Sequence, residues 1–425
     1  DLENARVVSM SGRRARTVMP LCLLFDFDGA WQWFEDHAES QPLRARYMEA
    51  FNTFNAVSVP ATVLEDADDG KLRVIFARIN RSGKRLKSSE VFDALNSSAS
   101  TGRTLQSISD AVARATGFGE ISEEYVLNVM KARRHPDYMR DVGTEFADER
   151  RRASDFPEED QDAAYAETER VIIQAVRFLQ DSCCIPHVTL LPYGAVLYVV
   201  SRFFALFPEP KRRNKELLKR WVWRSVSKMI NGGMSGAGVQ TRSFLKNVRR
   251  DDESGSIQRL LDGVGGRSSG ERVAIPIARM NRSDARACVC AMWSYYVRAK
   301  DYGGAASIEL FDSLVGGSGS ASELLVDYVE RHRVAGEENR LYSSLANKVL
   351  LVDEEAHQDA DAARSFMDSH PGMLILPDGT GGAGSSGDPV HALERREELL
   401  SARVNEFFDL MMAWDYESFA PVELK

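Results

Sequence analysis

The pattern of apolar and polar positions separates a short mixed segment from a long helical one. Residues 57–64 and 71–79 are short, β-branched runs, which predict two strands. From about residue 105 to 300 the apolar positions recur at helical spacing. We expect helices at 31–55, from Ser88 onwards, and at 160–179, 194–207, 215–230, 285–299 and 391–414. This mixture predicts an α+β protein that is predominantly helical.

Composition supports a folded chain with a real core. The chain has 425 residues, of which 44% are apolar and 28% are charged. These values exclude a mostly disordered chain, a collagen and a small disulfide scaffold. The longest apolar run, at 194–207, is interrupted by Ser201 and Arg202, so no stretch reaches the ~20 apolar residues that a bilayer span needs. We therefore predict no membrane partner.

Charge and cysteine content narrow the class of protein further. The net charge of −9 excludes a globally basic nucleic-acid coat. Basic clusters, either solvated surface or local phosphate contacts, lie at 13–16, 81–87, 211–213 and 249–250. The 5 cysteines are odd in number and closely spaced, which argues against secreted disulfides and for a reducing cytoplasm. Cys183, Cys184, Cys288 and Cys290 are too few and too close together for a four-ligand zinc site, so we interpret them as small buried thiols.

Two phosphate-related motifs match only in part. The text LLFDFDG at 23–29 is similar to a haloacid-dehalogenase signature, in which an apolar strand leads to a nucleophilic carboxylate, here Asp26. Ala30 stands where that signature has Thr or Val, so we favour a strand end with solvated carboxylates. The text RSGKR at 81–85 lacks two Walker-loop residues, because Arg78 and Arg85 occupy their positions.

The most specific local text is FARINRSGKRLKSSEVFDAL, residues 76–95, which predicts a strand, a turn and a helix. Arg78 offers a planar fork of donors to a phosphate or a carboxylate, although an ordinary salt bridge is the alternative. Asn80 can hold a turn, and Gly83 permits a positive φ. Glu90 falls early in the helix, where a negative charge is favourable.

This segment resembles the GmrSD-type family of modification-dependent restriction and phage-defence proteins. The matching positions are Phe76, Arg78, Ile79, Asn80, Gly83, Leu86 and Glu90. The resemblance implies a ParB/sulfiredoxin-like module, with Arg78, Asn80 and Lys84 facing a nucleotide or a DNA phosphate. An Asp-Gly-Gln-Gln-Arg motif handles the nucleotide in that family; here it would lie upstream of Asp1, or the protein has lost it.

The resemblance also implies an HNH-type nuclease unit near the carboxyl end, namely a β-hairpin and a helix. His332 would be the general base, and Asn347, which follows 15 positions later, the orienting residue. His357 and Asp361 would form the side that holds Mg²⁺ or another divalent cation. Glu330 lies two positions before His332, whereas the family usually has a His or an acidic residue directly before it.

These observations predict three domains: a partial ParB-like module at 1–104, a helical domain at 105–300 and a degenerate HNH-like domain at 301–425. The leading hypothesis is a nucleotide-regulated, metal-dependent anti-phage DNA endonuclease, or a subunit of one. It would act on DNA, modified phage DNA above all, with an NTP and a partner defence subunit. The second hypothesis is a catalytically inactive DNA- or partner-binding regulatory subunit, with Asn347 as a turn residue. A haloacid-dehalogenase phosphatase is the third.

Overall fold

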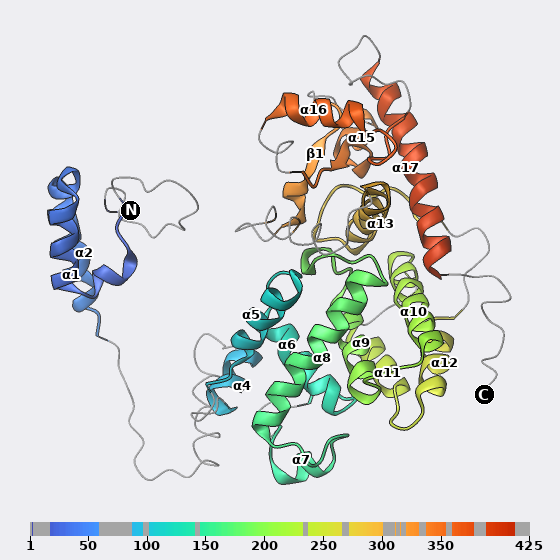
Figure 1. The fold of residues 1–425 in the computed structure, drawn as a ribbon, viewed down its shortest axis with the longest axis horizontal. Coiled ribbons are helices and arrows are strands. Elements are labelled where there is room, and N and C mark those ends of the chain that lie inside the picture. Colours follow the sequence, from blue (N-terminus) through green and yellow to red (C-terminus); the bar gives the residue numbers. More distant parts are fainter. Residues whose placement is uncertain are drawn as a thin grey trace. The chain divides into compact units, whose positions relative to one another are not determined.

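The computed structural model resolves the chain into two compact units, Asp1–Phe76 and Ala77–Lys425 (Figure 1). The residues that the structure describes are 2, 18–58, 87–96, 102–140, 145–232, 237–265, 272–300, 311, 315, 320–330, 337–353, 359–377 and 388–412. Each unit has a hydrophobic core of its own, and the two cores share no residue.

The first unit is a small pair of helices with a short turn before each. Its elements are η1 (Leu21–Leu24), α1 (Phe27–Asp36), η2 (Ala38–Leu43) and α2 (Arg44–Asn55). The single helix predicted at 31–55 is wrong, because α1 ends before His37 and Pro42 lies inside the 3₁₀ turn that follows. Phe34 and Tyr47 are fully buried and hold α1 against α2, with the two rings edge to face.

The second unit begins with a bundle of helices, as the sequence predicts for 105–300. Its helices are α4 (Ser88–Asn96), α5 (Leu105–Thr116), α6 (Glu123–Arg134), α7 (Asp148–Arg152), α8 (Gln161–Asp181), η3 (Val188–Leu190), α9 (Gly194–Leu206), α10 (Arg212–Ile230), α11 (Ala237–Asn247), α12 (Glu253–Val264) and α13 (Ser283–Lys300). Several begin at a polar cap; the Asp160 carboxylate, for example, accepts the N–H of Ala163 at the start of α8.

The helices of this bundle enclose an extended apolar core. α8 packs against α5, α6 and α9, while α10 packs against α12, α13 and the long terminal helix α17 (Pro389–Met412), as Figure 1 shows. Trp221 and Trp223 of α10 are fully buried in this core. Among the described helices, none is both long and apolar enough to cross a bilayer.

The carboxyl-terminal part of the second unit holds the described β-structure. Its elements are η5 (Ala321–Leu324), β1 (Leu325–Asp327), α15 (Glu337–Ser343), η6 (Leu345–Asn347), β2 (Lys348–Leu350), α16 (Ala360–Ser369) and α17. β1 and β2 pair antiparallel, with Leu325 opposite Leu350 and Asp327 opposite Lys348. β1 therefore pairs with a strand that follows α15 in the chain.

The predicted architecture is thus confirmed at the coarse level. The chain is predominantly helical and carries a small two-stranded antiparallel sheet. The expected strands at 57–64 and 71–79 lie outside the described residues from position 59 onwards. The division into domains at 1–104, 105–300 and 301–425 remains a prediction.

Candidate functional site

The predicted site residues fall unevenly between the described and the remaining parts of the chain. Asn347 and Asp361 are described. The other predicted residues lie outside the described ranges; they are Arg78, Asn80, Lys84, His332 and His357. Glu90, a further residue of the GmrSD-like segment, is described at the start of α4, where its carboxylate accepts the N–H of Lys87 at 2.7 Å. Glu90 therefore acts there as a helix cap.

Asn347 is fully buried, and its side-chain amide links the segment just after β1 to α15. Its Oδ1 accepts the backbone N–H of Val329 at 2.8 Å, and its Nδ2 donates to the backbone carbonyl of Tyr342 at 3.3 Å. The backbone carbonyl of Asn347 also accepts the N–H of Tyr328 at 3.0 Å. Asn347 thus fixes the backbone just after β1, three residues before His332.

Local sequence explains why Asn347 occupies this position. Ser344 caps the one-turn helix η6, because its Oγ accepts the N–H of Ala346 at 3.1 Å. β2 follows at once, and Lys348 forms an ion pair with Asp327 of β1, with Nζ and Oδ1 2.6 Å apart. The turn therefore places Asn347 directly before β2, beside the Asp327–Lys348 end of the two-stranded sheet, with its side chain buried.

Arg396 of α17 holds the same turn from the other side. Its side chain is fully buried, and its Nη2 donates to the backbone carbonyl of Lys348 at 2.6 Å. Its Nη1 donates to the carbonyls of Leu345 and Ala346. The guanidinium also lies over the ring of Tyr328, 5.3 Å from its centroid. Burial lowers the pKa of Arg396 to about 9.

Asp361 lies in the first turn of α16, and its side chain is exposed to solvent. The neighbouring Asp359 caps this helix, since its carboxylate accepts the N–H of Ala362 at 2.7 Å. Within the described ranges, no group of three or more His, Cys, Asp or Glu side chains is arranged to hold a metal ion. Of the two predicted cation ligands the structure describes Asp361, and the described donors around it do not complete a cation site.

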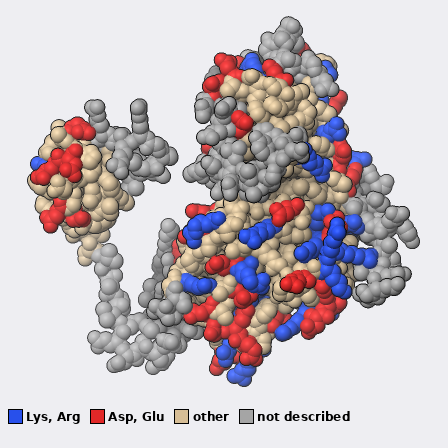
Figure 2. Space-filling view, viewed as in Figure 1, with Lys and Arg blue, Asp and Glu red and all other residues tan. Residues whose placement is uncertain are grey.

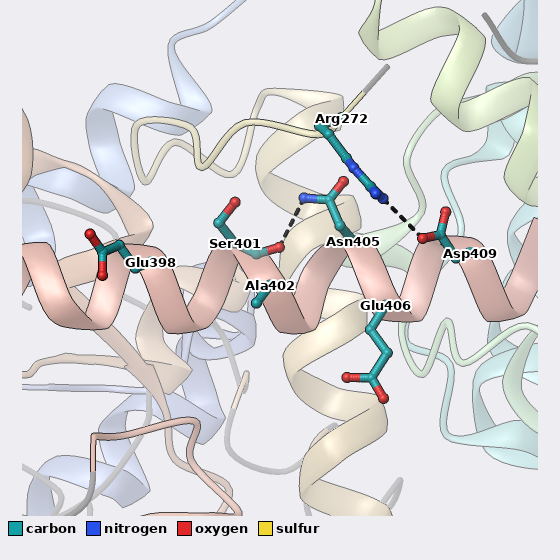
Figure 3. A pocket seen from close by; sticks show the side chains of 7 residues that line it. All are labelled: Arg272, Glu398, Ser401, Ala402, Asn405, Glu406 and Asp409. Carbon is teal, nitrogen blue, oxygen red and sulfur yellow. Dashed lines mark hydrogen bonds and ion pairs between the residues drawn. The ribbon is translucent and has the colours of Figure 1, made fainter. Parts of the chain in front are cut away.

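A groove of about 670 Å³ runs along α17 (Figure 3). Arg272 reaches across it to Asp409, with Nη1 and Oδ2 2.9 Å apart, and Glu406 points away from Arg272. Asn405 is engaged by the backbone of Val273, which donates to its Oδ1 at 2.9 Å and accepts from its Nδ2 at 3.1 Å. These contacts bind the 272–273 segment to α17, and the groove contains no nucleophile paired with a base.

The phosphatase alternative does not fit the structure around Asp26. The expected apolar strand is instead the 3₁₀ turn η1, and Asp26 follows it as the N-cap of α1. Its carboxylate accepts the N–H of Gly29 at 3.0 Å. A Cβ at Gly29 would lie 2.3 Å from Asp26 Oδ2, so the glycine makes room for the cap. Asp26 starts a helix and does not end a strand.

The cysteines behave mainly as core residues. Cys183, Cys288 and Cys290 are buried and reduced, as predicted, and burial raises the pKa of each thiol. Cys184 is partly buried, and Cys22 is exposed. His187, near the Cys183–Cys184 pair, caps η3 and has its Nδ1 2.9 Å from Thr189 Oγ1.

Sequence reasoning missed the buried arginines that organise the second unit. Arg396 lies on the apolar stripe of α17, three residues after Leu393 and four before Leu400. A charged residue on such a stripe is the signal that would have identified it. Arg202 gave the same signal inside the apolar run of α9; its Nη2 pairs with Asp155 Oδ2 at 2.7 Å.

No family model, curated protein or solved structure matches the chain.

Proposed function

We propose that this chain is a DNA endonuclease of the GmrSD type, or a subunit of one, and that its carboxyl-terminal part hydrolyses phosphodiester bonds. The supporting observation is the buried amide of Asn347, which fixes the backbone of Val329 three residues before His332. A general base needs a defined position relative to its substrate, and a locked hairpin supplies one. β1 and β2 are also an antiparallel pair that α16 follows in the chain, as in two strands and a helix, with α15 and η6 inserted between the strands.

In this proposal the residues have distinct roles. His332 removes a proton from the attacking water, and Asn347 orients the segment that carries His332. His357 and Asp361 are ligands of a divalent cation. When bound, this cation would polarise the scissile phosphate. Arg78, Asn80 and Lys84 face a nucleotide or a DNA phosphate in the ParB-like module. An NTP regulates the activity.

A plasmid-nicking assay with Mg²⁺ or Mn²⁺ tests the catalytic assignment. The His332→Ala variant is expected to lose cleavage by about 100-fold or more, as is typical for a general base. His391→Ala, which removes an exposed histidine of α17, serves as the matched control and keeps wild-type cleavage. Cleavage that is equal in the wild type and His332→Ala would remove the HNH assignment.

The same assay includes Asn347→Ala, whose role is structural support of the site. This change leaves the Val329 N–H without its acceptor, so we expect a loss of about 2 kcal/mol in the free energy of unfolding and reduced nicking. Urea unfolding measures the first effect. Unchanged stability together with unchanged nicking would show that the hairpin does not depend on this amide.

The second candidate function is a catalytically inactive DNA- or partner-binding subunit. It is favoured by the hydrogen bonds of the Asn347 amide, which are made to the backbone of Val329 and Tyr342 within the same part of the protein. A hairpin retained for packing would show the same contacts. Absence of nicking under every metal condition, combined with retained binding to duplex DNA, would select this function.

A further inference from the structure

A cleft of about 480 Å³ lies between α8 and α10 in the helical bundle, away from the β1–β2 hairpin in sequence. Its lining includes Arg170, Gln174, Arg177 and Ser182 from α8 and its end, and Lys215 from α10. Two helices that are separated along the chain thus bring three cations to one concave surface. The carboxylate in the lining is Asp181.

The cations of this cleft differ in how far they are already neutralised. Arg170 pairs with Glu167, with Nε and Oε2 2.8 Å apart, and donates to Gln174. Arg177 and Lys215 are exposed, and among the described residues neither side chain has a hydrogen-bonding or ion-pair partner. Arg177 and Lys215 thus bring two positive charges to the cleft against the one carboxylate of Asp181, so the lining has an excess of positive charge.

We propose that this cleft binds a phosphate of the DNA backbone, through Arg177 and Lys215, with the hydroxyl of Ser182 as a further donor. A guanidinium and an ammonium that line the same cleft are suitable donors for the oxygens of one phosphate or of two successive ones. The inference rests on the proposed DNA function and extends it, since it gives the helical bundle a role in holding the substrate.

The shape of the cleft favours a backbone phosphate over a free nucleotide. A nucleotide site encloses its ligand and offers a surface to the base. Here the two aromatic side chains, Phe178 and Phe204, are buried beneath the cleft and pack edge to face with centroids 5.4 Å apart. No aromatic face of the lining is open for stacking a base. The contact therefore carries no sequence information.

The charges around the cleft fit a contact with DNA at a few points, and not a broad basic surface that DNA would cover. Figure 2 shows basic and acidic side chains interspersed over the face of the bundle that carries α8 and α10. Lys211, Arg212 and Arg213, at the start of α10, are exposed and extend the positive charge beyond Lys215. On an acidic protein, DNA would then be held at a few defined phosphates.

The test measures binding of fluorescein-labelled duplex DNA by anisotropy over a range of salt concentrations. The protein is the full chain with His332→Ala, kept free of divalent cations, so that cleavage does not interfere. In this background Arg177→Gln/Lys215→Gln is compared with Arg114→Gln/Lys246→Gln. The control pair removes the same charge from exposed positions at the ends of α5 and α11. Thermal melting verifies that each variant is folded.

Each lost phosphate contact is expected to reduce the slope of log K against log salt by about 0.9. The Arg177→Gln/Lys215→Gln protein should therefore show a slope that is smaller by about 2. Its loss of affinity between about 50 and about 200 mM salt should be about tenfold smaller than that of the parent. Two duplexes of unrelated sequence should give the same change, and the control pair should give none.

Other outcomes separate this inference from the proposed nuclease function. An unchanged slope in the cleft variant, with DNA binding intact, overturns the cleft while leaving the DNA function standing. Saturable binding of ATP or inorganic phosphate that only the cleft variant loses would also overturn it, because the ligand would then be a free anion. If the wild type does not nick DNA but the cleft variant shows the predicted change in slope, the nuclease function is contradicted and the DNA contact in the cleft is supported.

Discussion

Buried arginines and glutamates form a network within the helical bundle. Glu159 receives Arg133 Nη2 at 2.6 Å and Arg134 Nη1 at 2.7 Å. Glu145, whose side chain is fully buried, receives Arg134 Nε at 3.1 Å and also pairs with Arg140. Removing one member of such a network leaves an uncompensated charge inside the protein, which is strongly destabilising. The network therefore ties the end of α6 to the segments on either side of α7.

His135 stands at the edge of this network and makes stability depend on pH. Burial, and then the charge of Arg140, lower the pKa of His135 in the folded protein. Its Nδ1 also accepts the N–H of Asp137 at 3.0 Å, which a protonated ring cannot do. The unfolded chain therefore binds more protons than the folded one at pH values below about 6.5.

We accordingly expect the free energy of unfolding to decrease as the pH falls from about 7.5 to about 5.5. The His135→Gln variant lacks this contribution, so its free energy of unfolding should decrease less over the same interval. Urea unfolding of both proteins at the two pH values measures the difference. An equal decrease in the two proteins would show that His135 titrates alike in the folded and unfolded states.

The long helix α17 is anchored at two points by buried arginines. Arg396, on α17, donates to the backbone of the turn at 345–348. Arg224, on α10, donates to the carbonyl of Met412 at the carboxyl end of α17, with distances of 3.1 Å from Nε and 3.0 Å from Nη2. Burial lowers the pKa of Arg224 to about 10. α17 therefore links the helical bundle to the hairpin that holds Asn347.

Substitution of Arg396 tests this link. Arg396→Met removes the donors to several carbonyls of the buried turn, so we expect the free energy of unfolding to decrease by about 2–4 kcal/mol. Nicking should decrease in parallel, because the turn also carries Asn347. Arg395→Met is a matched control, since Arg395 is the exposed neighbour on the same helix. Similar stability of the two variants in urea would contradict the anchoring role of Arg396.

The chain as a whole contains two separate cores. The small core of the first unit is built on Leu24, Ala30, Phe34 and Tyr47, whereas the core of the second unit includes α4 to α17. Because stability comes mainly from burial within one core, each unit should unfold according to its own contacts. The second unit, which contains the proposed hairpin and cleft, should not need the first one for folding.

Deletion of residues 1–76 tests this independence. We expect the free energy of unfolding of the second unit to change by no more than about 0.5 kcal/mol, the usual effect of changes outside a core. Its thermal unfolding midpoint should therefore stay nearly the same. Thermal unfolding followed by far-ultraviolet circular dichroism measures the midpoint. A clear decrease, or a protein that no longer folds, would show that the second unit depends on the first.

Helices could be predicted well from the sequence, and the hairpin could not. The apolar spacing at 194–207 and 391–414 indicated α9 and α17 to within a few residues, since helical periodicity is a local property. β1 lies in a short apolar run, and it pairs with β2 across α15. Strand pairing depends on segments that are distant in the chain, so the run alone did not specify its partner.

The sequence by itself thus indicated the helical class and pointed to Asn347 as a residue of interest, because side-chain chemistry and spacing can be read locally. Packing between distant segments settled the remaining features. It enclosed Arg396 beneath the turn at 345–348 and brought Arg177 and Lys215 to one cleft. A charge on a helix is exposed, buried or shared with another helix according to what packs against it, and that depends on contacts that local sequence does not encode.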